Sequence, residues 1–170
     1  MIDTRSVSFE EEKSREWKLK EARDILERII GDSPKEESLE KLLDPEKLVI
    51  CSYSLGKILS SFRIGLKTAQ VRRFYEAILG LNTAMKSWSR DKSTEAENEF
   101  EYFQKIIKPQ VMMLKPQLAN AQARQSREFT PLFTVLNPCI NRVNSTRDLA
   151  RLAQFMESIV AYHRFHGGRD

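Results

Sequence analysis

The chain has 170 residues, 31% of them charged, and a formal net charge of +4. A chain of this length forms one ordinary domain and buries about 70% of the surface that its unfolded form exposes, so it needs no disulfide or metal for stability. The first residues contain no apolar segment of the signal-peptide type, and the longest apolar runs are too short to span a bilayer. We therefore predict a single helical-bundle domain over residues 1–170, in the cytoplasm and without membrane contact.

Charge is distributed unevenly along the chain. Residues 1–47 carry a net charge of −4, and residues 91–107 carry −3. Residues 48–90 carry +6 and residues 108–127 carry +4, with Glu76 as the one acidic residue in these two basic segments. The cations can offset the acidic segments inside the folded domain, or they can form a surface for a polyanion. The charge pattern leaves both alternatives open.

The first part of the chain predicts one charged helix and a linker. We expect a frayed tail over residues 1–8, a helix from about Phe9 to Ile30, and a linker over residues 31–44 with one or two helical turns. The apolar edge of this helix is narrow and consists of Trp17, Ala22, Ile25, Leu26 and Ile29. A helix with so thin an apolar edge belongs at the rim of a bundle.

Two amphipathic helices follow. Asp44-Pro45-Glu46 is a strong helix start, because it combines an Asp cap, a Pro in the first turn and an acid near the positive helix end. Thr68 is expected to cap the next helix. The inward positions of the first are Leu48, Cys51, Leu55, Ile58, Leu59, Phe62 and Leu66, and those of the second are Val71, Phe74, Tyr75, Ile78, Met85 and Trp88.

A fourth helix is predicted from Ser93 or Thr94 to about Arg127, and prolines interrupt it. Lys108-Pro-Gln-Val recurs seven residues later as Lys115-Pro-Gln-Leu, and each Pro removes an amide donor, so the helix should bend at both places. Its inward positions include Ala96, Phe100, Phe103, Ile106, Ile107, Val111, Leu114, Leu118 and Ala121. A fifth helix is predicted to start at Thr130-Pro131, with a kink at Pro138.

The last helix, over residues 149–166, has the widest apolar stripe. Ser145 is positioned to cap it, and Gly167-Gly168 can end it. The stripe contains Leu149, Leu152, Ala153, Met156, Ile159, Val160 and His163. The predicted fold is therefore an all-α bundle of about five to six helices, with a central C-terminal helix and a Pro-kinked fourth helix.

The sequence contains little that indicates chemistry. It has no Gly-rich phosphate loop, no cysteine pair at zinc spacing and no nucleophile with a base. His163 and His166 are three residues apart but lack further ligands, so we expect a hydrogen-bonded core His163, an exposed His166 and no metal or cofactor. Cys51 and Cys139 are expected to be buried free thiols. We predict that the chain is not an enzyme.

Four segments in order resemble a known family: Asp44-Pro-Glu-Lys-Leu, Thr68-Ala-Gln-Val-Arg-Arg-Phe-Tyr75, Leu114-Lys-Pro-Gln-Leu-Ala119 through Arg124, and Phe155-Met-Glu-Ser-Ile-Val-Ala-Tyr-His-Arg-Phe-His-Gly-Gly168. Together they are similar to the small helical subunit of type III-A CRISPR effector (Csm) complexes, the Csm2 family. The resemblance covers about residues 44–168, and the closing block is its most specific part. The resemblance implies a non-catalytic antiviral-defence protein, present in several copies that stack along the guide crRNA and its paired target RNA. Its partners would be other copies of itself and the backbone and large subunits of the complex.

The resemblance also implies where RNA is bound. The basic and polar positions of the matching segments become candidates for phosphate contact: Lys67, Gln70, Arg72, Arg73, Lys115 and Arg124. The five cations among them lie in the two basic segments. The helix that begins at Thr68 also directs its first-turn amides toward the same end. Arg72 has an alternative role, because it can pair with Glu76 one turn away. The alternative function is a helical protein–protein adaptor without RNA contact.

Overall fold

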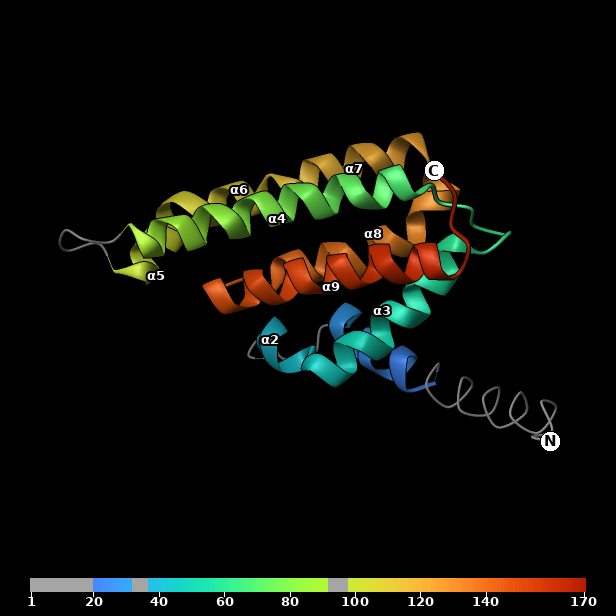
Figure 1. Cartoon of the computed structure of the whole chain (residues 1–170), viewed down its shortest axis with the longest axis horizontal. Helices are drawn as coiled ribbons and strands as arrows, with labels where there is room; N and C mark the ends of the chain where they lie inside the picture. The colour runs from blue at the N-terminus through green and yellow to red at the C-terminus, as the bar shows by residue number, and fades with distance from the viewer. Residues whose placement is uncertain (1–19, 32–36, 92–97) are drawn as a thin grey trace, which may run out of the picture.

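The computed structural model describes residues 20–31, 37–91 and 98–170, and these residues form helices and no strand (Figure 1). Residues 20–30 are helical. The helices that follow are α2 (Leu39–Leu42), α3 (Pro45–Ser60), α4 (Thr68–Arg90), α5 (Glu99–Tyr102), the π-helix η1 (Phe103–Ile107), α6 (Lys108–Met112), α7 (Leu114–Arg124), α8 (Ser126–Asn141) and α9 (Thr146–Phe165). The all-α prediction is confirmed. Residues 9–19 of the predicted first helix and its Trp17 lie outside the described residues.

Helix α9 is the centre of the bundle, as the sequence predicts. It contacts α3 on one side and α4 on the other, and Figure 1 shows it between them. Leu152 and Met156 have no solvent exposure, because the wide apolar stripe is covered from several sides. The Ser145 hydroxyl accepts from the Asp148 amide at 3.1 Å, and Gly167 ends the helix with a φ of 90°.

Helix α3 begins at the predicted cap. The Asp44 carboxylate accepts from the Lys47 amide at 2.9 Å, and this hydrogen bond lowers the pKa of Asp44. Farther along, α3 crosses α9 at Gly56. A Cβ atom there would lie 2.8 Å from the backbone nitrogen of His163, so only glycine allows this approach. No local pattern around Gly56 in the sequence indicates this crossing point.

The proline repeat divides the fourth helical region into short segments. The π-helix η1 ends just before Pro109, and the Lys108 amide donates to the Phe103 carbonyl five residues back. A second break falls at Met113, between α6 and α7 and ahead of Pro116. The wider turn suits a position where the following Pro has no amide to donate. Two boundaries differ from the prediction: the region ends at Arg124, and Asn98 caps its first described turn, whereas Ser93 and Thr94 lie outside the described residues.

Helix α8 begins four residues earlier than predicted, at Ser126, so that Pro131 lies inside it. The reason is tertiary. Phe129 is fully buried, and its ring lies 5.5 Å from that of Phe74 on α4. Packing against α4 therefore extends the helix through a region where local sequence favours a start at Thr130-Pro131.

Several predicted inward positions are wrong. Ile58 is 43% exposed, Phe62 is fully exposed, and Phe100 and Ile106 are 65% and 45% exposed. Phe62 follows the end of α3, and Phe100 lies in the first turn of α5. Apolar residues keep their helical spacing even where no neighbouring helix covers them. Periodicity alone therefore predicts more core residues than the structure buries.

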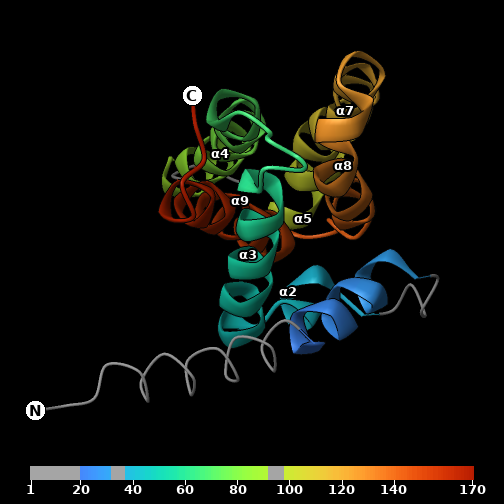
Figure 2. The same ribbon diagram turned by 90° about the vertical axis from the view of Figure 1, so that its right-hand side faces the viewer.

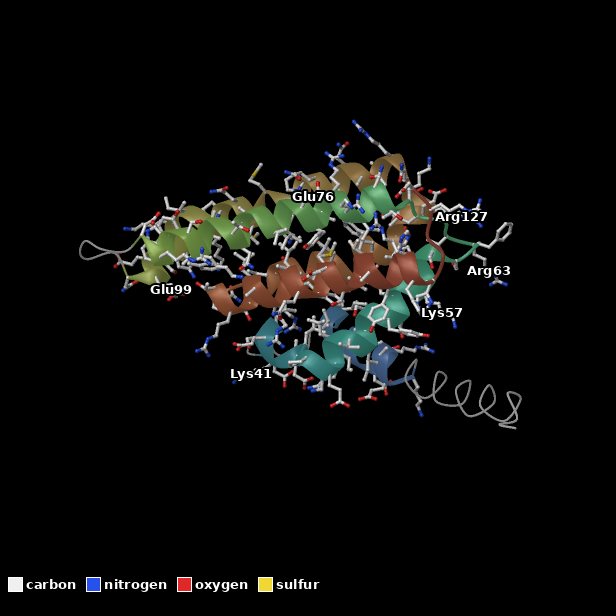
Figure 3. The ribbon with its side chains drawn as sticks, in the orientation of Figure 1. Lys41, Lys57, Arg63, Glu76, Glu99 and Arg127 are labelled. Atoms are coloured by element: carbon white, nitrogen blue, oxygen red, sulfur yellow. The ribbon has the colours of Figure 1, made fainter. Side chains whose placement is uncertain are left out.

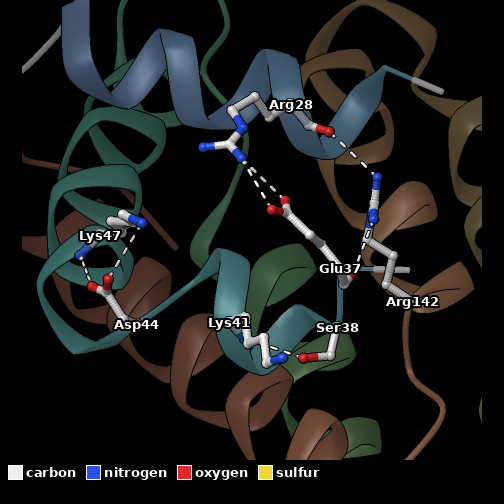
Figure 4. A network of polar contacts seen from close by, with 7 residues as sticks. All are labelled: Arg28, Glu37, Ser38, Lys41, Asp44, Lys47 and Arg142. Carbon is white, nitrogen blue, oxygen red and sulfur yellow. Dashed lines mark hydrogen bonds and ion pairs between the residues drawn. The ribbon is translucent and has the colours of Figure 1, made fainter. Parts of the chain in front are cut away.

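Arg142 forms hydrogen bonds that connect the N-terminal helix to the rest of the bundle (Figure 4). Its guanidinium donates to the Glu37 carbonyl at 3.1 Å and to the Arg28 carbonyl at 3.3 Å. Arg28 in turn pairs with the Glu37 carboxylate at 3.1 Å. Nearby, the buried Asp148 carboxylate accepts from the Glu40 amide at 3.0 Å. The hydrogen bonds that Arg142 and Asp148 form therefore hold the N-terminal helix and the linker against the rest of the bundle, in addition to apolar packing.

The two cysteines are buried and free, as predicted. Burial raises the pKa of Cys51 and of Cys139 to about 12. Both thiols therefore stay protonated and unreactive at neutral pH.

Candidate nucleic-acid interface

Four of the six predicted RNA-contact residues lie at the start of α4. Lys67 occupies the N-cap position, and Gln70, Arg72 and Arg73 fall in the first two turns. At about 1.5 Å per residue, the whole group spans roughly 9 Å of helix axis. Because Phe74 faces the core, Arg73 is exposed to solvent, while Gln70 and Arg72 are partly exposed on the flanks.

Three hydrogen bonds from the end of α9 and the chain after it fix the backbone on both sides of Lys67. His163 is fully buried, and its Nε2 lies 2.6 Å from the Leu66 carbonyl, so Nε2–H donates there. Nδ1 is then the acceptor for the Thr68 hydroxyl at 3.2 Å. The Thr68 amide donates to the Arg169 carbonyl at 2.9 Å. The prediction of a hydrogen-bonded core histidine is confirmed.

Thr68 is therefore not the cap that the sequence predicts. Its hydroxyl is engaged by His163, and Lys67 takes the N-cap position without a side-chain cap. Two of the first-turn amides are also occupied, that of Thr68 by Arg169 and that of Gln70 by the Lys67 carbonyl at 3.0 Å. The positive character at this helix end thus comes mainly from side chains, and less from open amide donors than expected.

The arginines of this group form no ion pair within the described part of the chain. In particular, no ion pair joins the described residues Arg72 and Glu76. The acidic N-terminal helix pairs its charges close by, as in the 3.0 Å contact between Arg23 and Glu27. Figures 1 and 2 both place that helix on the side of the bundle away from α4. Among the described residues, the cations at the start of α4 do not serve to neutralise it.

The lysines of the proline repeat have hydrogen-bond partners at the end of α8 and in the segment just after it. Lys108 donates to the Asn144 side chain at 2.9 Å, and Lys115 donates to the Asn141 side chain. The two lysines, seven residues apart, therefore contact Asn141 at the end of α8 and Asn144 in the segment between α8 and α9. Lys115 retains two further N–H donors, but part of its binding capacity is used within the fold.

Arg124 lies nearer to the α4 group than Lys115 does. It is the exposed last residue of α7, and Figure 1 shows this end of α7 at the same end of the molecule as the start of α4. Figure 2 looks onto that end and shows the two helices apart from each other across it. Lys115 is nine residues back, about 13 Å along the helix. Five of the six predicted residues thus gather at one end of the molecule, and Lys115 does not.

The same end carries exposed cations that the predicted set lacks. Figure 3 places Lys57, Arg63 and Arg127 there, on α3, on the loop after α3 and on α8. All three fall in the two basic segments of the sequence, so the charge pattern contains the signal. The resemblance does not mark them, because they lie outside its matching motifs. We call these residues, with Lys67, Arg72, Arg73 and Arg124, the basic end.

His166 is partly buried, not exposed as predicted. Its ring lies 4.6 Å from that of Tyr53 on α3 and 5.2 Å from that of Phe165. Aromatic packing between α3 and α9 thus explains its position without a metal. Within residues 20–31, 37–91 and 98–170, no three His, Cys, Asp or Glu side chains are grouped to hold a metal ion. None of the helices described could cross a membrane, since none is both long and apolar enough.

The described residues form an all-α bundle with a cationic end, which places the chain among the helical-bundle proteins. The family model of Csm2 Type III-A matches residues 42–169, about three quarters of the chain. The chain belongs to this family and is a subunit of a type III-A CRISPR (Csm) effector complex. Neither a curated protein nor a solved structure matches the chain significantly.

Proposed function

We propose that this subunit is non-catalytic, acts in the cytoplasm and holds RNA by its phosphate backbone through the basic end. Several copies would stack along the crRNA and its paired target RNA, next to the backbone and large subunits of the complex. The single observation that carries the proposal is the group at the start of α4. Its cations are accessible and form no ion pair with a described carboxylate, although an acidic helix is present in the same chain.

Backbone recognition suits the residues at this end. Lysine and arginine contact phosphates without reading sequence, and in an RNA-guided complex sequence is read by base pairing. Lys67 is also held on a fixed backbone, since both neighbouring residues bond to His163. The side chain is therefore presented from a rigid position, which reduces the entropy lost when it binds.

A salt titration tests the proposal directly. Arg73→Ala should weaken binding about equally for RNAs of unrelated sequence, and the slope of log affinity against log salt should become shallower by about 0.7–1. Its melting temperature should stay unchanged, because Arg73 is exposed and makes no ion pair. Arg23→Ala, on the acidic N-terminal helix, removes the same charge away from the basic end and is the control for the salt slope, which it should leave unchanged. An unchanged slope with lost stability for Arg73→Ala would instead favour a charge-balancing role.

A specific surface favours a protein-contact role beside RNA binding. Phe100, Ile106 and Met113 are 65%, 45% and 60% exposed along the region from α5 to α7. The region from α5 to α7 thus exposes several large apolar side chains, and exposed apolar surface is often a protein contact site. We infer that this apolar surface contacts a neighbouring subunit. Phe100→Ser combined with Met113→Ser should reduce co-purification of partner subunits and leave the RNA salt slope unchanged.

A further inference from the structure

A hollow of about 530 Å³ lies between the end of α3, the loop that leads into α4 and the residues after α9. Its walls include Ser61, Phe62, Lys67, Arg169 and Asp170. It thus combines one aromatic ring, two cations and one acidic residue, drawn from two parts of the chain about one hundred residues apart. Backbone phosphate contact at the start of α4 needs neither the ring nor the hollow.

The ring of Phe62 is held in solvent by an ordered turn. The Gly65 amide donates to the Ser61 carbonyl at 2.8 Å, and the Leu66 amide donates to the Leu59 carbonyl at 2.9 Å. Gly65 adopts a φ of 62°, which suits a glycine in such a turn. Leu66 is buried, whereas Phe62 is fully exposed. The turn therefore buries one apolar side chain and directs another into water, on a backbone that is already rigid.

Two cations share the lining of the hollow with this ring. Lys67 and Arg169 line the hollow with it, and Arg63 follows it directly in the loop. Figure 3 shows Arg63 at the tip of that loop, extending away from the helices. Asp170 contributes the single acidic side chain, so basic side chains outnumber acidic ones in the lining. An apolar partner would bury these charges, whereas a nucleotide has a flat face for the ring and a phosphate for the cations.

We propose that this hollow binds one unpaired ribonucleotide, with its base stacked on Phe62 and its phosphate next to Lys67 and Arg169. The inference rests on the proposed RNA-binding function and adds a base contact to the backbone contacts. Aromatic stacking tolerates any base, so the site does not read sequence. It distinguishes single-stranded from paired RNA, because a base inside a helix is already stacked and is not available to the ring.

The test compares single-stranded and duplex RNA of one sequence, each titrated with the full-length protein at several salt concentrations. Phe62→Ala should weaken single-strand binding about tenfold, leave duplex binding unchanged and keep the salt slope, because no charge is removed. Phe62→Trp should retain binding. Phe62→Leu should weaken binding as Phe62→Ala does, since it keeps an apolar side chain and loses the aromatic face. Phe100→Ala removes an exposed phenylalanine outside the basic end and is the control for the RNA titrations alone.

Two results would overturn the inference: equal loss on single-stranded and duplex RNA, or no loss on either. Reduced co-purification of partner subunits with unchanged single-strand affinity would overturn it as well, and would make Phe62 a protein contact. The proposed function is tested separately by Arg73→Ala. If that variant makes the salt slope shallower while Phe62→Ala has no effect, only the stacking site is rejected. If both variants bind RNA as the unchanged protein does, both proposals fail.

Discussion

Arginine has opposite roles in two regions of this molecule. Arg142 is buried at the N-terminal side, and it donates to two backbone carbonyls that belong to different parts of the chain. Arg72 and Arg73 lie at the basic end, accessible to solvent and without an ion pair to any described carboxylate. The first guanidinium replaces its water with protein acceptors, and the others remain hydrated. The comparison shows that only the second group is free to exchange its water for phosphate.

The largest effect is expected where both regions depend on the same helix. Met156→Asp should leave the chain unfolded, since Met156 has no solvent exposure in α9 and an unpaired buried carboxylate costs several kcal/mol against a total stability of about 5–15 kcal/mol. Circular dichroism during thermal melting measures this. Gln154→Asp adds the same charge at an exposed position of α9 and should melt normally. A cooperative melt for Met156→Asp would contradict the central place of α9.

The second prediction isolates the structural arginine. Arg142→Met should lower the free energy of unfolding by about 1–3 kcal/mol, because two partly buried hydrogen bonds from a charged donor are lost. Urea unfolding measures the loss, and the RNA salt slope of the folded variant should stay unchanged. Arg147→Met, at an exposed position near the start of α9, should be neutral for stability. A shallower slope for Arg142→Met would remove the distinction between the two arginine groups.

The third prediction concerns the hydrogen bonds that His163 makes on both sides of Lys67. Burial lowers the pKa of His163 below its ordinary value of about 6.5, against the opposing effect of its bond to the Leu66 carbonyl. As the pH falls below about 6.5, the unfolded chain binds a proton at His163 more readily than the folded chain does. The free energy of unfolding therefore has its full value above pH 6.5 and decreases as the pH drops below it. Urea unfolding between pH 5 and 8 should show this fall in the unchanged protein and a smaller one in His163→Gln. Equal pH profiles for the two proteins would contradict it.

The smallest effect separates two cations of α7. Lys115→Ala should lower stability by about 0.5–1 kcal/mol through the lost contact with Asn141, with little change in the RNA salt slope. Arg124→Ala should leave stability within about 0.5 kcal/mol and make the slope shallower, because Arg124 is exposed at the basic end. Urea unfolding and salt titration of both variants decide this. The reverse result would place the RNA contact at Lys115.

Much of the candidate interface can be predicted from the sequence. The contacts that its residues make with distant helices cannot. The stripe of Val71 and Phe74 already directs Arg73 outward, and the charge pattern marks both basic segments. The partner of Lys115 could not be predicted, because Asn141 lies on another helix. The fixed backbone around Lys67 was equally hidden, since it depends on His163 about one hundred residues away. Contacts of this range depend on how helices pack, which periodicity does not encode.

The sequence by itself determined the all-α class, the place of α9 at the centre, the Asp44 and Ser145 caps and the breaks near the prolines. Each depends on residues within one or two turns, where local hydrogen bonding and apolar spacing dominate. Only the tertiary structure decided that α8 starts at Ser126, that Gly56 lets α3 approach α9, and that Phe62 faces solvent. These features depend on whether another helix covers a given position, and burial against a distant segment outweighs local preference there.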